Sequence, residues 1–462
     1  MKYLLQEFRG KRVHFVGIGG AGMSGLARVM VAESIEVSGS DMKDSSVLSG
    51  LRAIGATVHS THLAQHVEGA DYLVFSSAID MNNPEIVRAR ELGIPMLSRA
   101  QALAVLMSES QSIAVAGTHG KTTTSSMLTV AIQSCGEDPS FAIGGTLTAS
   151  GSNAHKGTGN HFIAEADESD GSFVEYHPFG AIITNVEHDH VDYFATPEDV
   201  VIAFKHFIET ISPDGFLVYC ADDSGSAALS QGVENISLIS YGSAEGAHLR
   251  IDQIELTPGG SRARALWRGR SIGELVLNVP GEHNLLNAAG ALAAGLALNL
   301  PATQLLAGLS TFRGTGRRFE LKGQVQGIRV IDDYGHHPTE IIATLNAAKR
   351  YATDGRVLVI FQPHRYSRTK AFTSQFAQAL EIADKSWVLE VYGASEKPIP
   401  GVTGRSITQG MRNGIFEPNF ISACEAIVES AQPGDVIVTL GAGDVSSLAP
   451  LILEALSKKY QN

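Results

Sequence analysis

Cysteine is scarce in this sequence of 462 residues: Cys135, Cys220 and Cys424 lie far apart, and no CxxC pair occurs. This spacing argues against a disulfide framework and against a thiolate zinc site, and a reducing cytoplasm is the expected compartment. The sequence also lacks an uncharged apolar stretch of about 18 residues, so we expect no membrane-spanning helix. Residues 1–7 become polar too early for a secretory signal peptide.

Positive charge is also in short supply. The chain has 35 lysines and arginines against 48 aspartates and glutamates, which gives a formal net charge of −13. An acidic chain without a basic cluster argues against nucleic acid or an anionic membrane as the main partner. Anionic small ligands stay open, because a local site can be positive inside an acidic protein.

Glycine, in contrast, is abundant, with 48 residues. The glycines lie mostly at the ends of expected strands and before expected helices, as is typical of α/β nucleotide-binding folds. The length predicts two to four domains, and strands that alternate with helices predict parallel sheets. The pattern divides the chain into three α/β blocks, at about 1–107, 108–314 and 315–462.

The expected elements come from apolar runs and from the turn signals that bound them. The expected strands are 12–16, one that ends at Val37, 72–75, 112–116, 161–165, 180–184, 328–331, 356–361, 386–390 and 434–440, with a β-rich stretch at 235–280. The expected helices include 23–32, 84–91, 121–133 and 284–297.

The run Gly117-Thr118-His119-Gly120-Lys121-Thr122-Thr123 follows an expected strand and opens an expected helix. A helix N-terminus carries unpaired N–H groups and partial positive charge, and a glycine loop lets the backbone wrap around a phosphate there. Lys121 would reach the β- and γ-phosphates, and the Thr122 hydroxyl could ligate Mg²⁺. Val115 stands where the standard pattern has its first glycine, so the match is partial. The run predicts ATP binding.

A second glycine signature, Gly17-Ile18-Gly19-Gly20-Ala21-Gly22, also lies between a strand and a helix, and Asp41 follows the next strand. This pattern requires only a diphosphate at the helix end. A dinucleotide such as NAD or FAD and a UDP-sugar fit equally well, and glycines that serve helix–strand packing alone are the remaining interpretation.

Carboxylates and histidines follow the later strands. Residues 165–170 form an acidic cluster that begins with Glu165, and such clusters beside a phosphate loop commonly hold Mg²⁺. Residues 187–192 contain a His-x-His pair that could bind a metal, pair with a carboxylate or be structural. Arg365 and Arg368 would share a helical face, and guanidinium groups suit carboxylates or phosphates.

Together, these motifs resemble the Mur ligases of peptidoglycan synthesis. The matching stretches are 14–25, 38–41, 117–123, 165–170, 281–284, 316–320, 332–338 and 362–369. The resemblance implies a Rossmann-like N-terminal domain for a UDP-sugar, a P-loop-type central ATPase domain and a Rossmann-like C-terminal domain for the amino acid and nucleotide. It implies an enzyme that uses ATP and Mg²⁺ to join L-alanine to UDP-N-acetylmuramate through an acyl phosphate.

The resemblance also assigns roles to individual residues. ATP binding is implied for Gly117, Thr118, His119, Gly120, Lys121, Thr122, Thr123, Asn284, Asn287, Arg318, Asp332 and Asp333. Catalysis is implied for Lys121, Glu165, His190 and Arg318, and metal binding for Thr122, Glu165 and His190. UDP-sugar binding is implied for Gly17, Gly19, Gly20, Ala21, Gly22, Ser40, Asp41, Ser76 and Ser77. Amino-acid binding is implied for Tyr334, His336, His364, Arg365 and Arg368.

Several Mur ligases carry a carbamylated lysine that braces a second Mg²⁺, whereas the alanine-adding branch generally does without it. Lys205 follows His190 at a suggestive distance, but a solvated lysine on a helix face is the preferred interpretation.

Three rival functions stay open. A ligase that joins recycled murein peptides to UDP-N-acetylmuramate would have a different glycine signature. An NAD-dependent oxidoreductase leaves Lys121 unexplained, and a non-catalytic UDP-sugar sensor does not require Lys121, Glu165, His190 and Arg318 to be present together. The expected partners are small molecules, with no nucleic acid and no membrane span, and the chain is expected to be a monomer or weak homo-oligomer.

Overall fold

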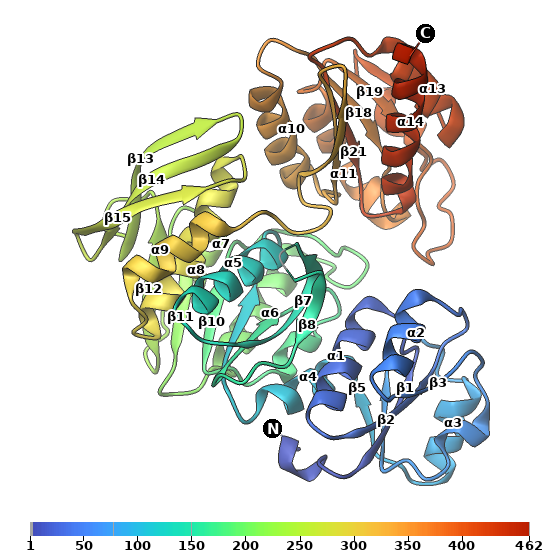
Figure 1. Ribbon diagram of the computed structural model, residues 1–462, viewed down its shortest axis with the longest axis vertical. Coiled ribbons are helices and arrows are strands. Elements are labelled where there is room, and N and C mark those ends of the chain that lie inside the picture. Colours follow the sequence, from blue (N-terminus) through green and yellow to red (C-terminus); the bar gives the residue numbers. More distant parts are fainter. Residues whose placement is uncertain (1–2, 77, 149, 462) are drawn as a thin grey trace.

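The computed structural model describes residues 3–461 apart from 77 and 149, and these residues form three α/β lobes, each around its own sheet. In Figure 1 the blue N-terminal lobe and the brown-to-red C-terminal lobe lie at the bottom and top of the view, with the green-to-yellow middle lobe beside both. Within the described part of the chain, no helix is long and apolar enough to cross a membrane.

The N-terminal lobe has a parallel sheet with strand order β3-β2-β1-β4-β5. Its strands are β1 (Arg12–Val16), β2 (Glu36–Ser40), β3 (Thr57–His59), β4 (Tyr72–Phe75) and β5 (Met96–Ser98), and its helices are α1 (Ala21–Ala32), α2 (Ser46–Ala53), α3 (Pro84–Glu91) and α4 (Arg99–Met107), with 3₁₀ turns η1 (Leu5–Glu7) and η2 (Ala64–Val67). This order matches five of the six strands of the Rossmann order 3-2-1-4-5-6. The second strand continues to Ser40 instead of ending at Val37, because Val37 to Ser40 pair in register with residues 13–16 of β1.

The middle lobe has a ten-stranded sheet with order β15-β14-β13-β12-β11-β10-β6-β9-β7-β8. Its strands are β6 (Gln111–Ala116), β7 (Ser140–Leu147), β8 (Ser152–His155), β9 (His161–Glu165), β10 (Gly180–Ile183), β11 (Phe216–Cys220), β12 (Ser237–Gly242), β13 (Leu249–Thr257), β14 (Gly260–Trp267) and β15 (Arg270–Leu277). Its helices are α5 (Lys121–Ser134), α6 (Pro197–Glu209), α7 (Ser224–Leu229), α8 (Glu282–Ala297) and α9 (Ala302–Thr311), with the 3₁₀ turn η3 (Ser172–Glu175).

This middle sheet is mixed, whereas the alternation of strands and helices predicts a parallel one. The strands from β7 through β9, β6, β10, β11 and β12 run parallel, but β8 and the β13–β15 meander add antiparallel pairs. The meander strands alternate buried and exposed residues, as expected for a sheet with one solvated face. The alanine-rich α8 packs against α5 and α9, since small side chains let helices approach closely.

The C-terminal lobe has a six-stranded sheet with order β16-β17-β21-β18-β19-β20. Its strands are β16 (Glu320–Val325), β17 (Ile328–Asp333), β18 (Val357–Phe361), β19 (Lys385–Val388), β20 (Gly414–Phe416) and β21 (Val436–Leu440). Its helices are α10 (Pro338–Ala352), α11 (Tyr366–Leu380), α12 (Gly404–Thr408), α13 (Phe420–Ser430) and α14 (Leu448–Gln461), with the 3₁₀ turn η4 (Asp444–Ser447). All pairs are parallel except the β16–β17 hairpin at the edge, and β16 and β20 are absent from the sequence-based expectation.

A buried carboxylate organises the N-terminal lobe. Glu85, in the first turn of α3, is 0% exposed. Its oxygens accept a hydrogen bond from Ser40 Oγ at 2.5 Å and lie 2.9 Å from His62 Nδ1 and 3.0 Å from His66 Nδ1. His14 Nε2, on β1, lies 3.6 Å away. Four strand and loop segments are therefore joined through one negative charge.

The ionised form of Glu85 is held by these contacts. Burial alone would raise the pKa of Glu85, but its contacts with His14, Ser40 and His62 outweigh burial and lower the pKa to about 2. Because the folded-state pKa lies below the ordinary value of 4.5, the carboxylate stabilises the fold above about pH 4.5, and this contribution is lost as the pH falls through about 2.

We predict that Glu85→Gln lowers the free energy of opening of the N-terminal sheet by about 3–5 kcal/mol at pH 7, because Ser40, His62 and His66 lose the charged carboxylate that they share. Hydrogen exchange of the β1 and β4 amides measures this loss. The difference in the free energy of opening between the wild type and Glu85→Gln should shrink as the pH falls from 4.5 to 2. Glu91→Gln, at the exposed end of the same helix, is the control and should stay within about 0.5 kcal/mol; equal protection in both variants contradicts the assignment.

Candidate active site

The site is built around the loop between β6 and α5. Gly117 has φ +130°, and a Cβ there would lie 2.0 Å from Thr184 Oγ1, so only glycine fits. Gly120 precedes the helix with φ +82°, and a Cβ there would lie 2.5 Å from Asn287 Oδ1. The two glycines let the backbone turn tightly at the helix N-terminus, where an anion is favoured by the free N–H groups and the helix dipole.

Lys121 is bent back over this loop. Its ammonium donates hydrogen bonds to Gly117 O at 2.7 Å and Thr118 O at 3.1 Å, and it forms an ion pair with Glu168 at 2.7 Å. Burial alone would lower the pKa of Lys121, but the charge of Glu168 and of nearby aspartate and glutamate raises it. Lys121 therefore carries a full positive charge at the point where a phosphate would bind.

Thr122 and Glu165 form a pair of oxygen donors beside Lys121. The Thr122 hydroxyl donates to Glu165 Oε1 at 3.1 Å, and Glu165 Oε2 accepts from the N–H of Gly144 at 2.7 Å. Burial raises the pKa of Glu165 despite the attraction of Lys121. A buried carboxylate and a hydroxyl at this separation suit a hard divalent cation such as Mg²⁺, whose charge would keep Glu165 ionised.

His190 lies on the other side of Glu168. Its backbone has φ +50°, and its Nε2 is 3.6 Å from Glu168 Oε1 and 3.9 Å from Asp189 Oδ2. Lys121 and His190, which are 69 positions apart in the sequence, therefore contact the same carboxylate. The predicted catalytic residues Lys121, Glu165 and His190 lie in one acidic region of the middle lobe.

The arginines of the C-terminal lobe reach across to this region. Arg368 is 2% exposed and binds Asp189 through two hydrogen bonds of 2.8 and 3.1 Å. Burial opposes ionisation of Asp189, but the charge of Arg368 lowers its pKa far below the ordinary value. Arg365, only partly buried, forms an ion pair with Asp192. The two arginines thus contact acids that follow β10.

The other residues predicted for the amino acid gather beside these arginines. His364 Nδ1 lies 3.3 Å from Arg368 Nη1, and the His336 ring lies 5.8 Å from the His364 ring. The Tyr334 ring lies 5.3 Å from the His336 ring. Burial lowers the pKa of His336 to about 3 and that of His364 to about 4, so both rings are neutral.

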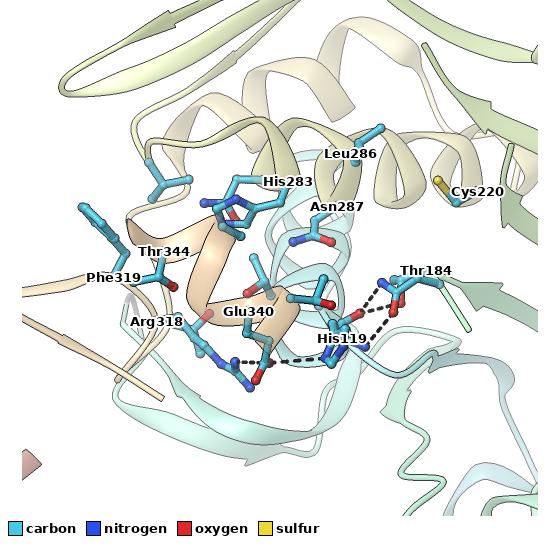
Figure 2. Close-up of a pocket in the computed structure, with 18 of the residues that line it drawn as sticks. His119, Thr184, Cys220, His283, Leu286, Asn287, Arg318, Phe319, Glu340 and Thr344 are labelled. Carbon is cyan, nitrogen blue, oxygen red and sulfur yellow. Dashed lines mark hydrogen bonds and ion pairs between the residues drawn. The ribbon is translucent and has the colours of Figure 1, made fainter. Parts of the chain in front are cut away.

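A cavity of about 270 Å³ lies between the middle and C-terminal lobes. Figure 2 shows His283 and Asn287 of α8 on one side and Arg318, Phe319 and Glu340 on the other. Of the residues predicted to bind ATP, seven line this cavity: His119, Gly120, Thr123, Asn284, Asn287, Arg318 and Asp333. Its walls suit a flat apolar ring with polar edges next to the phosphate loop.

The two neighbouring aspartates have different positions. Asp333 lines the cavity, but its oxygens already accept from the N–H groups of Phe319 and Gly335 at 2.8 Å each. Asp332 lies outside the cavity and pairs with Arg317 at 3.2 Å and Thr439 at 2.8 Å. Only Asp333 is therefore placed to meet a ligand in this cavity.

Residues that the sequence interpretation did not single out complete the cavity. Glu340, in the first turn of α10, forms an ion pair with Arg318 at 3.2 Å and lies 3.7 Å from His119 Nδ1 (Figure 2). On the other side, His119 Nε2 lies 3.3 Å from Glu187. Burial alone would lower the pKa of His119, but Glu187 and Glu340 raise it to about 9. No sequence spacing links these residues, which come from three distant segments.

The N-terminal glycine signature faces a second cavity, of about 340 Å³. Gly20, Ala21 and Gly22 line it from the N-terminal lobe, and Glu165 and Asp167 line it from the middle lobe. Ser76 also lines it, whereas Ser77 lies outside the described residues. The loop before α1 and the acidic strand end of β9 therefore share one space.

Arg99 is a further residue of this cavity. It is the first residue of α4, its Cδ is 3.1 Å from where a Cβ on Gly22 would lie, and its Nη2 is 4.0 Å from Asp167. Burial alone would lower the pKa of Arg99, but Tyr176, Asp167 and other acidic groups raise it. A cation at the start of a helix, next to a glycine turn, suits a diphosphate.

Ser40 and Asp41 support the loop from behind. Asp41 Oδ2 accepts from the N–H of Gly19 at 2.9 Å, and the Ser40 carbonyl accepts from the N–H of Gly17 at 2.9 Å. The Ser40 side chain is fully buried against Glu85. Lys205 is exposed on α6, as expected for a solvated lysine.

Comparisons with known proteins agree with this geometry. Three family models match successive parts of the chain: "Mur ligase family, catalytic domain" at 12–111, "Mur ligase middle domain" at 115–295 and "Mur ligase, glutamate ligase domain" at 317–443. The chain is 49% identical over 461 residues to a UDP-N-acetylmuramate–L-alanine ligase from Renibacterium salmoninarum, with 97% of each chain covered.

Solved structures show the same three-lobed fold. A UDP-N-acetylmuramate–alanine ligase from Thermotoga maritima is similar with a TM-score of 0.81 and 29% identity, covering 97% of this chain and 100% of that one. A murein peptide ligase from Psychrobacter arcticus has a TM-score of 0.71 and 26% identity, with 97% and 99% covered. From the N-terminal glycine loop to the last strand of the C-terminal sheet, this chain belongs to the Mur ligase family.

Proposed function

We propose that this protein is an ATP-dependent ligase that joins L-alanine to UDP-N-acetylmuramate in peptidoglycan synthesis. One observation carries the proposal: the cavity of the N-terminal glycine loop is also lined by Glu165, which bonds Thr122 of the phosphate loop. A carboxylate on a UDP-sugar and the γ-phosphate of ATP would therefore meet at Glu165. The 49% identical relative, which carries the name of this activity, supports the same substrates.

The proposed reaction has two steps. An oxygen of the substrate carboxylate attacks the γ-phosphorus of ATP, and the bond between this phosphorus and the oxygen that bridges to the β-phosphate breaks. ADP departs, and the substrate carboxylate is now an acyl phosphate. The amine of L-alanine then attacks the acyl carbon, loses a proton and expels phosphate from the tetrahedral intermediate. Two anions approach each other in the first step, so the site must supply positive charge.

In this proposal Lys121 contacts the β- and γ-phosphates after leaving the carbonyls of its own loop. Thr122 and Glu165, with His190 nearby, would hold Mg²⁺, which supplies charge neutralisation at the phosphates. Arg318 would contact the nucleotide from the C-terminal lobe, where it borders the cavity. Gly20 to Gly22 and Arg99 would hold the UDP diphosphate.

Arg365 is the better placed of the two arginines to bind the carboxylate of L-alanine. Its ion pair with Asp192 is partly exposed and can be exchanged at little cost. Arg368, in contrast, is buried and neutralises Asp189, so we propose that it positions the loop after β10. His336 and His364 would border the amino acid as neutral rings.

The remaining expectations stay proposals: lobe boundaries at 1–107, 108–314 and 315–462, a monomer or weak homo-oligomer, and a cytoplasmic enzyme. A ligase for recycled murein peptides is the second candidate, favoured only by the similarity to the Psychrobacter arcticus structure. An oxidoreductase or a UDP-sugar sensor would leave the Lys121–Glu168–His190 cluster without a role.

A substrate panel tests the function. Phosphate release should require ATP, Mg²⁺, UDP-N-acetylmuramate and L-alanine together, and mass spectrometry should find the amide-linked product. Preference for the murein tripeptide over L-alanine would establish the second candidate. Tight NADH binding without ADP release would establish the oxidoreductase.

Lys121→Ala should reduce ADP formation by at least about 10³-fold, because the developing phosphoryl charge loses its main side-chain cation. Binding of the UDP-sugar, measured by calorimetry, should change by less than about threefold, since the glycine loop lies in another lobe. Lys205→Ala, on the exposed face of α6, is the matched control and should keep full turnover. Unchanged turnover in Lys121→Ala would refute the proposed role, and loss of turnover in Lys205→Ala would point to a carbamylated lysine.

The two arginines should separate in kinetics and stability. Arg365→Ala should raise the KM for L-alanine by at least about tenfold with a stability loss of at most about 1 kcal/mol, because its ion pair is partly exposed. Arg368→Ala should destabilise the protein by about 3–5 kcal/mol, because Asp189 is left buried without its counter-charge. Thermal unfolding measures the stability losses, and initial rates measure the KM for L-alanine. A large stability loss in Arg365→Ala with a raised KM in Arg368→Ala would exchange the two roles.

A further inference from the structure

His119 of the phosphate loop forms a cluster with Glu187 and His337, two residues to which the proposed reaction gives no role. One ligand atom from each residue lies within 4.8 Å of the other two. Glu187 Oε2 is 3.3 Å from His119 Nε2 and 3.7 Å from His337 Nδ1. These residues are distinct from Thr122, Glu165 and His190, where Mg²⁺ is proposed to bind.

We propose that His119, Glu187 and His337 form a binding site for a zinc-class transition-metal ion that links the middle lobe to the C-terminal lobe. Two ligands about 2.0–2.2 Å from a tetrahedral zinc ion are about 3.4 Å apart, which agrees with both measured separations from Glu187. Two imidazoles and one carboxylate favour zinc, cobalt or nickel over magnesium, which prefers oxygen ligands alone.

The state of His337 supports a cation at this point. His337 is the N-cap residue of α10 and is 5% exposed. Its Nδ1 accepts weakly from the N–H of Thr339 at 3.4 Å, which places the ring proton on Nε2. Nε2 is buried and has no hydrogen-bond partner among the described residues. The lone pair on Nδ1 therefore faces an oxygen of Glu187. Two hydrogen-bond acceptors then face each other with no proton between them, and a metal ion bound to both would remove this repulsion.

Outer partners for the ligands are also present. Thr339 Oγ1 donates to Glu187 Oε2 at 2.7 Å, and Glu340 Oε1 lies 3.7 Å from His119 Nδ1. A carboxylate on the far nitrogen of a metal-bound histidine orients the ring and strengthens it as a ligand. His119 and Glu187 also line the 270 Å³ cavity, so water or a bound anion can supply the fourth ligand.

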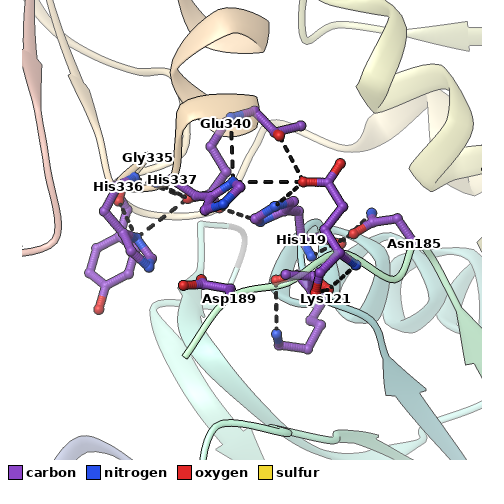
Figure 3. Close-up of polar contacts among 12 residues, drawn as sticks. His119, Lys121, Asn185, Asp189, Gly335, His336, His337 and Glu340 are labelled. Atoms are coloured by element: carbon purple, nitrogen blue, oxygen red, sulfur yellow. Dashed lines mark hydrogen bonds and ion pairs between the residues drawn. The ribbon is translucent and has the colours of Figure 1, made fainter. Parts of the chain in front are cut away.

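The three ligands come from two lobes, so a bound ion would hold these lobes together. His119 belongs to the phosphate loop and Glu187 to the segment after β10, whereas His337 caps α10 (Figure 3). An ion bound to all three holds the N-terminus of α10 against the phosphate loop. A metal ion bound to His119 Nε2 takes the place of a proton between that nitrogen and Glu187, so proton and metal compete for one position.

The test uses the full-length protein in millimolar Mg²⁺, so that hard oxygen sites are already filled. Zn²⁺ is titrated against a chromophoric chelator, and Co²⁺ is added separately to record visible absorption. The wild type should bind one tight Zn²⁺ per chain and give the intense cobalt bands of a four-coordinate site. This readout does not depend on ligase activity, so it holds whether or not the proposed function is correct.

Variants locate the ion. His337→Asn and Glu187→Gln should each weaken Zn²⁺ binding by more than about 100-fold, beyond the effect of losing an outer partner. His336→Asn, one position away and partly buried, and His190→Asn, at the proposed Mg²⁺ site, should stay within about threefold of the wild type. Circular dichroism checks that each variant folds. If His337→Asn does not fold, the affinity of Glu187→Gln for Zn²⁺ decides the result. Wild-type affinity in the folded Glu187→Gln variant, or loss of the ion in His190→Asn, would overturn the proposal.

Discussion

The structure depends on buried lysine and arginine side chains whose positive charge is balanced by carboxylates from other segments of the chain. Lys121, Arg318 and Arg368 are each at most partly exposed, and each pairs with a carboxylate from a distant part of the chain. A phosphate-binding site must place cations away from water, and an isolated buried cation is costly. Glu168, Glu340 and Asp189 remove that cost. Of these pairs, Arg368–Asp189 also joins the C-terminal lobe to the middle lobe, so one buried ion pair serves both charge balance and lobe arrangement.

This constraint has a consequence for substrate binding. An incoming phosphate or carboxylate does not enter empty positive sites, because it must replace carboxylates of the protein. Exchange of one anion for another is nearly balanced in energy, so partly exposed pairs such as Arg365–Asp192 can open readily. The buried Arg368–Asp189 pair cannot, and it keeps the loop after β10 in place. The proposed function thus divides substrate exchange and rigid positioning between two arginines three residues apart.

The sequence predicts those features that local physics determines. The three-lobe order, the strand β6 before the phosphate loop and the helix α5 after it follow from apolar runs and glycines. Val115, the apparent defect of the loop, lies inside β6 between Ile182 and Glu165, where a β-branched residue is favoured, and Gly117 makes the turn instead. The antiparallel edges and the partners Glu340 and Arg99 could not be predicted, because they depend on packing between segments far apart in the sequence.

Glu165 shows why the lobes must meet at the acidic end of β9. It borders the cavity of the N-terminal glycine loop and bonds Thr122 of the phosphate loop at 3.1 Å. Burial raises the pKa of Glu165 although Lys121 is near, so a further cation at this point favours the ionised carboxylate. In the proposed function, a divalent ion supplied with the nucleotide takes this role when the phosphates are present. In the proposed function, Glu165 therefore meets both the metal-bound nucleotide and the acceptor, and this shared position would couple the two substrates before any bond is formed.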